Sequence, residues 1–185
     1  MNPSLETLFQ KYASYDIAIG TDKSTIHSYS KLYESILSPV KDSIKNVLEI
    51  GVFSGASCQV WSEYLTGAQI YGLDIDFRNL IYGIQNPKIK YLQLDGTKSE
   101  CLKFLPEHFD FVLDDGSHRP YDQIQSAKLF VPKTDIYICE DINSLYMDEL
   151  KREFNHIAEI NSKTLFWHDL RDVKSRFDDI VAVIK

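Results

Sequence analysis

Two short stretches of the sequence place acidic residues and a histidine directly after apolar runs. LDDGSHRPYD spans residues 113–122 and follows the apolar start of FDFVL, and CED spans residues 139–141 and follows TDIYI. If both runs are neighbouring strands of one parallel sheet, their ends lie about 5 Å apart, so Asp115, Glu140 and Asp141 converge. Three converging carboxylates repel one another unless a cation holds them together. Oxygen ligands without a nearby Cys or His cluster favour Mg²⁺ or Mn²⁺ over zinc.

The first stretch also allows interpretations without catalysis. Asp–Gly is a favoured turn pair, and Asp114 could cap a helix that begins near Pro120. Ser117, His118 and Asp115 supply the residue types of a hydrolase triad, but adjacent serine and histidine side chains point apart and no G-x-S-x-G elbow occurs. A histidine has a reference pKa of about 6.5, which suits a general base. We interpret His118 as a base because of the acids predicted beside it on the next strand.

A second group of residues is typical of a turn that approaches a ligand closely. LEIGVFSGASC places Gly51 and Gly55 between a predicted strand and a predicted helix, with Phe53 where a dinucleotide fingerprint needs its middle glycine. A turn without a ligand is the alternative. Asp74 ends the next predicted strand and can accept hydrogen bonds from a ribose, and Asp95 ends the third and can bind a base or an amine. A ribose-bearing ligand without a bound pyrophosphate indicates S-adenosylmethionine.

The elements that must position these residues alternate between strands and helices. Strands are expected at 45–52, 68–76, 89–95, 109–115 and 134–141, and helical stretches at 55–65, 99–105, 121–130 and 145–157. This alternation predicts right-handed βαβ units, a mostly parallel sheet, and ligands at the carboxyl ends of its strands.

The two ends of the chain differ from this pattern. The runs 162–170 and 178–185 are separated by too few residues for a crossover helix, so they should pair antiparallel. Helical stretches at 5–13 and 29–37 flank the loop 20–27. We predict one α/β domain over 1–185. It consists of a helical extension over 1–45 and a Rossmann-like, doubly wound, seven-stranded sheet with an antiparallel last strand over 46–185.

The composition narrows the class of partner. The chain has 185 residues, 44% hydrophobic and 25% charged, with a formal net charge of −7 and no Lys/Arg block. This balance argues against a nucleic acid or an anionic membrane as the main partner. No apolar run approaches the roughly 20 residues of a membrane span, and the first ten residues do not resemble a signal peptide. Cys58, Cys101 and Cys139 are read as buried thiols, so we expect a cytoplasmic location.

The motifs together resemble a known family. EIGVFSGAS, LDID, LDGT and the predicted strand order resemble the class I S-adenosylmethionine-dependent methyltransferases over residues 45–185. GTDKSTIHSYSKLYE, DDGSH and CEDI are similar to a bacterial subgroup that contains metal-dependent macrolide-sugar O-methyltransferases and cephalosporin-hydroxylase-like relatives. The resemblance implies that Gly51 and Ser54 contact the methionine part of S-adenosylmethionine. It further implies that Asp74 contacts the ribose, and Asp95 with Gly96 the adenine. It also implies a lid over cofactor and substrate, formed by residues 20–23 (with Thr21 and Lys23) and Tyr29.

The resemblance extends to the metal site. Catechol-type O-methyltransferases bind their metal at these strand ends, and the pattern D-x-x-x-x-D from Asp110 to Asp115 puts the ligand on Asp115. Asp114 is then its neighbour on the cofactor side, although the choice between the two aspartates stays open. His118 matches the histidine base of the macrolide-sugar enzymes. Glu140 stands where catechol enzymes carry aspartate and Asp141 where they carry asparagine, which fits a sugar substrate better.

We therefore expect a Mg²⁺- or Mn²⁺-assisted O-methyltransferase that acts on a hydroxyl of a sugar, another small molecule or a glycan. The alternatives are a metal-dependent hydroxylase of the same fold, or a non-catalytic S-adenosylmethionine-binding module or partner subunit. The carboxylate site without a facial His pair counts against the hydroxylase. DDGSH stands where amino-methylating nucleic-acid enzymes carry [DN]-P-P-[YF], which disfavours DNA and RNA. The short N-terminal region leaves room for a second subunit of a homo-oligomer to complete the acceptor pocket.

Overall fold

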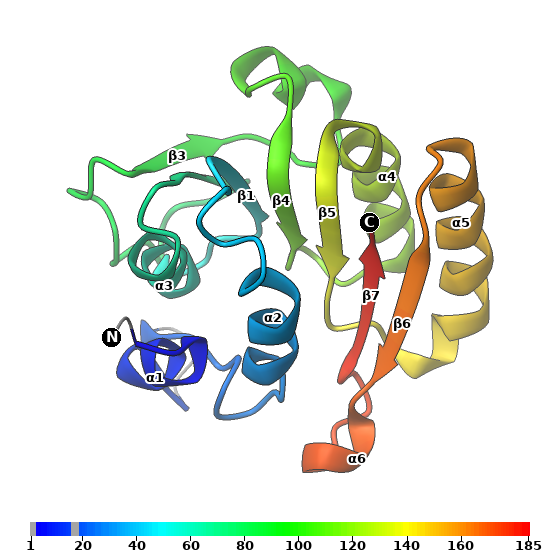
Figure 1. The fold of residues 1–185 in the computed structure, drawn as a ribbon, viewed down its shortest axis with the longest axis horizontal. Helices are drawn as coiled ribbons and strands as arrows, with labels where there is room; N and C mark the ends of the chain where they lie inside the picture. Colours follow the sequence, from blue (N-terminus) through cyan, green and yellow to red (C-terminus); the bar gives the residue numbers. More distant parts are fainter. Residues whose placement is uncertain (1–2, 16–18) are drawn as a thin grey trace.

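A computed structural model describes residues 3–15 and 19–185, and its centre is a seven-stranded sheet of order β3-β2-β1-β4-β5-β7-β6 (Figure 1). The strands are β1 (Asn46–Ile50), β2 (Gln69–Asp74), β3 (Ile89–Gln93), β4 (Phe109–Asp114), β5 (Thr134–Cys139), β6 (Leu165–Asp169) and β7 (Ile180–Ile184). The first five strands pair parallel, whereas β7 lies antiparallel between β5 and β6. The predicted α/β fold with an antiparallel last strand is confirmed.

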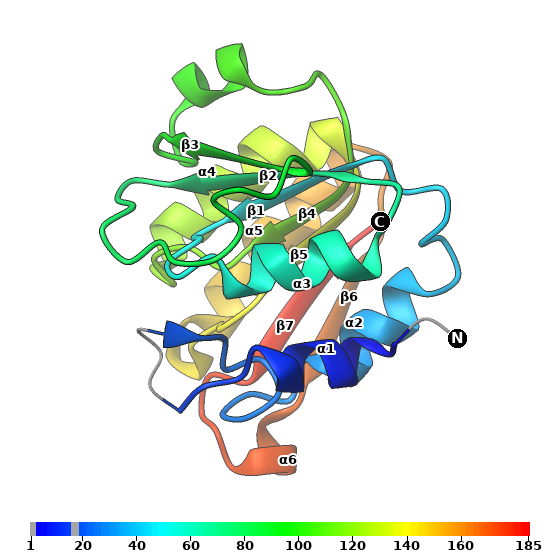
Figure 2. The ribbon, with the colours of Figure 1, turned by 90° about the vertical axis from the view of Figure 1, so that its left-hand side faces the viewer.

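Helices cover both faces of the sheet and enclose two hydrophobic cores (Figure 2). One core joins α1 (Leu5–Lys11), α2 (Ser30–Leu37) and α3 (Ala56–Tyr64) to the sheet, and the other joins α4 (Pro120–Phe130) and α5 (Met147–Ile160) to the opposite face. Because both faces are covered, all five residues of β7 are buried and apolar. Trp61 is fully buried and meets Phe9 and Phe111 edge-on, with ring centroids 5.3 and 5.5 Å away, which ties α1 and α3 to β4.

The remaining elements are short. They are the 3₁₀ helices η2 (Ser99–Phe104), η3 (Val131–Lys133) and η4 (Ser144–Tyr146), and the single turn α6 (Arg171–Lys174). The helix predicted over 99–105 is thus a 3₁₀ helix, and α6 fits inside the terminal hairpin. The predicted extension over 1–45 includes residues 1–2 and 16–18, which lie outside the described residues. None of the helices in the described part of the chain combines the length and apolar character that a membrane crossing needs.

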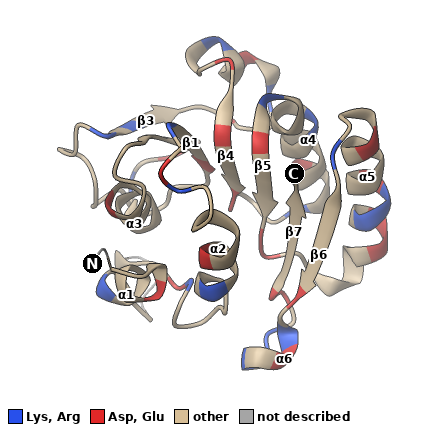
Figure 3. Cartoon of the chain, in the orientation of Figure 1, with Lys and Arg blue, Asp and Glu red and all other residues tan. Residues whose placement is uncertain are grey.

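The carboxyl ends of the central strands meet at one rim, where acidic residues gather (Figure 3). Asp115 follows β4, and Glu140 and Asp141 follow β5. Because β7 is antiparallel, its first end lies at the same rim and brings Asp178 and Asp179 there. The N-terminal loop that precedes α2 also reaches this rim, because Lys23 in that loop donates hydrogen bonds to Asp115 and Glu140.

Candidate active site

A pocket of about 660 Å³ lies at this rim, between the loop before α2 and the ends of β1, β2, β3 and β4. Most of the residues predicted for the site line it: Thr21, Lys23, Gly51, Ser54, Asp74, Asp95, Gly96, Asp114, Asp115, His118 and Asp141. Glu140 does not line it, and its side chain is only 1% exposed. The fold therefore gathers these eleven residues around one cavity and places Glu140 behind its wall. Tyr29, which was predicted to belong to the lid, is fully buried with its hydroxyl against Asp141.

The backbone of the turn after β1 packs closely against the end of β4. Gly51 has a φ of +86°, and a Cβ there would lie 1.9 Å from the backbone oxygen of Asp115. Asp74 holds this turn, because its Oδ2 accepts hydrogen bonds from the backbone N–H groups of Val52 and Phe53 at 2.8 and 2.9 Å. Only glycine fits at position 51 without moving the end of β4. This bare backbone at the pocket wall fits the predicted contact with a cofactor.

The ends of β2 and β3 complete this half of the pocket. Asp95 Oδ1 accepts hydrogen bonds from the backbone N–H and the hydroxyl of Thr97, at 2.9 and 2.7 Å. Desolvation opposes ionisation, but these hydrogen bonds lower the pKa of Asp95 below its usual value. A Cβ on Gly96 would meet Ile50 Cγ2 at 2.8 Å, so the backbone packs closely here as well. The Ser54 hydroxyl donates to the Gly20 carbonyl at 3.0 Å and ties the N-terminal loop to the β1 turn.

Three side chains at the ends of β4 and β5 face one another. Nε2 of His118 lies 4.0 Å from Asp115 Oδ1 and 3.8 Å from Asp141 Oδ2, and the three groups offer ligand atoms that all lie within 4.8 Å of one another. His118 has a φ of 56° and Asp141 a φ of 53°, a left-handed conformation that is uncommon for residues other than glycine. Such conformations cost free energy and cluster at active sites. The sequence predictions for Asp115, His118 and Asp141 therefore coincide in one place.

Glu140 has a different environment from Asp141. Its Oε1 accepts a hydrogen bond from Lys23 Nζ and its Oε2 accepts one from the Tyr33 hydroxyl. Lys23 Nζ also donates to Asp115 Oδ2 at 2.6 Å. Burial raises the pKa of Glu140 to about 7, against the opposing effect of the Lys23 charge. Burial alone would lower the pKa of Lys23, but the carboxylates around it outweigh burial and keep that pKa well above its usual value.

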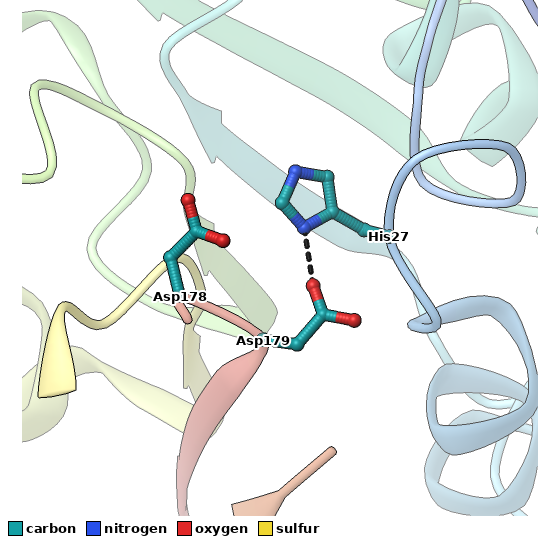
Figure 4. A group of neighbouring side chains, drawn as sticks. All are labelled: His27, Asp178 and Asp179. Atoms are coloured by element: carbon teal, nitrogen blue, oxygen red, sulfur yellow. Dashed lines mark hydrogen bonds and ion pairs between the residues drawn. The ribbon is translucent and has the colours of Figure 1, made fainter. Parts of the chain in front are cut away.

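A second buried group supports Asp141 from behind. His27 Nδ1 lies 2.5 Å from Asp179 Oδ1 (Figure 4). It also lies 3.3 Å from Asp141 Oδ1, and the Tyr29 hydroxyl donates to Asp141. Burial would lower the pKa of His27, but the carboxylates of Asp141 and Asp22 and the hydrogen bond to Asp179 raise it. His27, Asp178 and Asp179 also bring ligand atoms within 4.8 Å of one another. His27 is bonded directly to Asp179, however, so it connects the N-terminal loop to the start of β7.

Asp114 and Ser117 have structural partners. Asp114 Oδ2 accepts from the Tyr137 hydroxyl at 2.8 Å and Oδ1 from the Gly116 N–H at 3.2 Å, and burial raises the Asp114 pKa to about 6. The idea that Asp114 caps α4 is wrong, because that helix starts after Arg119 with no side-chain cap. The Ser117 hydroxyl donates to Asp122 at 2.5 Å, so it is not aimed at His118. Between the two aspartates, Asp115 is the one beside His118 and Asp141.

Sequence reasoning missed the residues that hold this rim from behind. None of His27, Tyr33 and Asp179 was assigned a place in the site. One signal was present for the tyrosines: Tyr29 and Tyr33 are four residues apart in a helical stretch, which places both on one face. Nothing in the sequence pattern connects His27 to Asp179, which is 152 residues away.

This strand order, with its antiparallel β7 and its pocket over the glycine turn of β1, defines a Rossmann-like methyltransferase of class I. The family model of the FtsJ-like methyltransferases matches residues 27–165, and the chain belongs to that family.

Two curated relatives illustrate where the chain lies within this class. It is 28% identical to the 8-demethyl-8-alpha-L-rhamnosyl tetracenomycin-C 2'-O-methyltransferase of Streptomyces olivaceus, over 69% of this chain and 36% of the relative. It is 29% identical to the mycinamicin VI 2''-O-methyltransferase of Micromonospora griseorubida, over 65% of this chain and 33% of the relative. The chain thus spans about a third of the length of these relatives.

Solved structures share the fold over 90% or more of this chain. The MycE methyltransferase of the mycinamycin biosynthetic pathway, in complex with Mg and SAH, superposes with a TM-score of 0.74 at 21% identity, covering 100% of this chain and 55% of that one. A Mg- and SAM-bound form of cmcI superposes with a TM-score of 0.63 at 18% identity, covering 90% of this chain and 74% of that one.

Proposed function

We propose that the chain transfers a methyl group from S-adenosylmethionine to a hydroxyl of a sugar-bearing small molecule, with the help of a divalent cation. The observation that carries this proposal is the convergence of Asp115, His118 and Asp141 within 4.8 Å, beside a pocket lined by the predicted cofactor residues. Relatives named as O-methyltransferases of rhamnosyl and mycinamicin substrates support the choice of a sugar hydroxyl.

The residues fit a hard divalent cation such as Mg²⁺ or Mn²⁺. Mg²⁺ is commonly held by one or two carboxylates while water and substrate oxygens complete its shell. Asp115 Oδ1 and Asp141 Oδ2 would supply these ligands, because both oxygens face the same space beside His118 Nε2. Glu140 stays a predicted third ligand, although Lys23 and Tyr33 occupy both of its oxygens. When bound, the cation would lower the pKa of a coordinated hydroxyl and orient it.

His118 would act as the general base. Its side chain is 42% exposed at the mouth of the site, so an acceptor hydroxyl can reach its Nε2. Proton removal by a positioned histidine typically contributes about 10²- to 10⁴-fold to a rate. Asp115 and Asp141, each within 4.0 Å of Nε2, would stabilise the imidazolium that forms.

The cofactor would occupy the other side of the pocket. Gly51 and Ser54 would meet the methionine part, Asp74 the ribose, and Asp95 with Gly96 the adenine, and Asp114 would support this wall from inside. Thr21 and Lys23, in the loop that Ser54 holds over the β1 turn, would cover the cofactor from above.

The test is the release of S-adenosylhomocysteine in the presence of a panel of deoxysugar glycosides. Activity should disappear with EDTA and return with Mg²⁺ or Mn²⁺. Full activity in EDTA would remove the metal from the proposal, and a methylated product without a new O-methyl group would remove the sugar hydroxyl. A protein whose melting temperature does not respond to S-adenosylmethionine would instead be a non-catalytic partner.

A further inference from the structure

Lys23 carries a buried ammonium group to which the proposed chemistry gives no role. Its side chain is 3% exposed, although it comes from an N-terminal loop, 92 residues from Asp115 and 117 residues from Glu140. Its ammonium group contacts both carboxylates directly. A buried lysine is costly unless it is paired, and removal of either partner leaves an uncompensated buried charge.

The pairing divides the oxygens of the acidic cluster. Asp115 turns Oδ2 to Lys23 and leaves Oδ1 toward His118, at 4.0 Å. Glu140 has both oxygens engaged, one by Lys23 and one by Tyr33. Asp141 is held through His27 and Tyr29 instead and keeps Oδ2 toward His118. The two oxygens that remain turned toward His118 are therefore Asp115 Oδ1 and Asp141 Oδ2, and Lys23 holds neither of them.

We propose that Lys23 is a positioning residue, a resident cation that fixes Asp115 and Glu140 and sets the negative charge with which the site meets a divalent cation. This inference rests on the proposed metal-assisted function. Lys23, Asp115 and Glu140 together carry a formal charge of −1. Without the lysine they carry −2, and the repulsion between the two buried carboxylates is then relieved by another cation or by a proton on one of them.

Two consequences distinguish this role from a simple structural contact. Loss of the lysine charge should destabilise the metal-free protein and at the same time strengthen metal binding, because the site becomes more negative. A residue needed only for folding would weaken both. A residue that preorganises ligands without a charge effect would also weaken metal binding when removed.

The experiment compares variants that differ in the charge of this three-residue group. Their Mn²⁺ binding is measured by calorimetric titration, and their thermal unfolding is measured with and without Mn²⁺. Lys23→Met makes the three-residue group −2, Glu140→Gln makes it 0, and the double variant Lys23→Met/Glu140→Gln returns it to −1. Lys11→Met is the control, because Lys11 pairs with Glu63 on the surface, where its side chain is 54% exposed.

We expect the affinity for Mn²⁺ to follow this charge order. Lys23→Met should bind Mn²⁺ about tenfold more tightly than the wild type and melt lower without it, and Mn²⁺ should raise its melting temperature more than that of the wild type. Glu140→Gln should bind at least about tenfold more weakly than the wild type, and the double variant should bind about tenfold more tightly than Glu140→Gln. Lys11→Met should match the wild type in both measurements.

The outcomes separate the two proposals. If Lys23→Met binds Mn²⁺ no more tightly than the wild type, or if the double variant stays as weak as Glu140→Gln, the inference about Lys23 is overturned. If Lys23→Met does not fold, the double variant still decides between these results. A wild type that binds no Mn²⁺ at all would contradict the metal in the proposed function. In that case a lower melting temperature of Lys23→Met than of the double variant would still support Lys23 as the resident cation.

Discussion

The two halves of the rim hold their acidic residues by different means. At the ends of β2 and β3, Asp74 and Asp95 accept hydrogen bonds from backbone N–H groups 2 to 22 residues away. At the ends of β4 and β5, Asp115, Glu140 and Asp141 are held by side chains that come from 92 to 117 residues away. The half proposed to bind the cofactor (the cofactor half) is thus built from local turns. The half proposed to carry the chemistry (the chemical half) depends on side chains from the N-terminal loop and α2.

This difference has an energetic side. At Asp95 desolvation opposes ionisation, but the local hydrogen bonds from Thr97 outweigh it. The buried acids of the chemical half need specific charged or hydroxyl partners, and removal of one such partner leaves a carboxylate without compensation. Substitutions in the chemical half should therefore have large and mutually dependent effects, and those in the cofactor half small and separate ones. The four predictions below test this contrast, from the largest expected effect to the smallest.

Gly51→Ala should have the largest effect, because Gly51 is where the two halves touch. Its added Cβ would lie 1.9 Å from the Asp115 carbonyl oxygen in a backbone conformation with φ of +86°. We expect the free energy of unfolding to fall by at least about 4 kcal/mol in urea titrations, together with loss of S-adenosylhomocysteine binding. Gly67→Ala is the control, since a Cβ there meets only the flexible end of Lys45, at 3.3 Å. Equal behaviour of the two variants would show that the halves are not locked together at Gly51.

His118→Ala should damage the chemistry and leave the cofactor half intact. We expect methyl transfer to slow by about 1,000-fold, which is within the range for the loss of a general base. S-adenosylhomocysteine and Mn²⁺ should bind as they do to the wild type, measured by calorimetry. His108→Ala serves as the control, because His108 pairs with Asp135 at the exposed opposite end of β4 and β5. A parallel loss of Mn²⁺ affinity would make His118 a metal ligand and not a base.

The same contrast explains which parts of the site could be predicted from the sequence. The strands follow from apolar runs, and the sheet rule then places Asp74, Asp95, Asp115 and Asp141 at one rim without any further information. The partners of the buried acids could not be found in this way. They lie about a hundred residues or more from the acids in the chain, so no helix or strand periodicity links the two. Asp179 illustrates the reason: it reaches the rim only because β7 runs antiparallel, and its bond to His27 spans 152 residues.

Glu49 tests the energetic cost of a buried acid below the pocket. It is fully buried in β1, where it accepts hydrogen bonds from Ser57 and from Cys58 Sγ at 3.1 Å, and burial raises its pKa to about 7. The folded state therefore holds the proton more tightly than the unfolded state. Its contribution to stability is full below pH of about 4.5 and is lost as the pH rises through about 7.

Glu49→Gln cannot ionise and should not show this loss. Between pH 5 and pH 8 the variant should gain about 2 to 3 kcal/mol of unfolding free energy relative to the wild type, measured by urea titration at both pH values. The exposed Glu100→Gln provides the comparison and should follow the wild type at both pH values. A constant difference between Glu49→Gln and the wild type would mean that Glu49 is ionised in the folded protein across this range.

Asp74→Asn should have the smallest effect, because the cofactor half is held locally. An asparagine keeps one carbonyl oxygen for the turn amides of Val52 and Phe53, which Asp74 Oδ2 now binds at 2.8 and 2.9 Å. It loses the charge and one acceptor, so S-adenosylhomocysteine should bind about tenfold more weakly, or about 1.4 kcal/mol, by calorimetry. Mn²⁺ affinity should not change. Asp76→Asn, on the exposed next turn, should alter neither. If Asp74→Asn also weakened Mn²⁺ binding, the two halves would be coupled through the β1 turn, and the division of the rim into a local and a long-range half would fail.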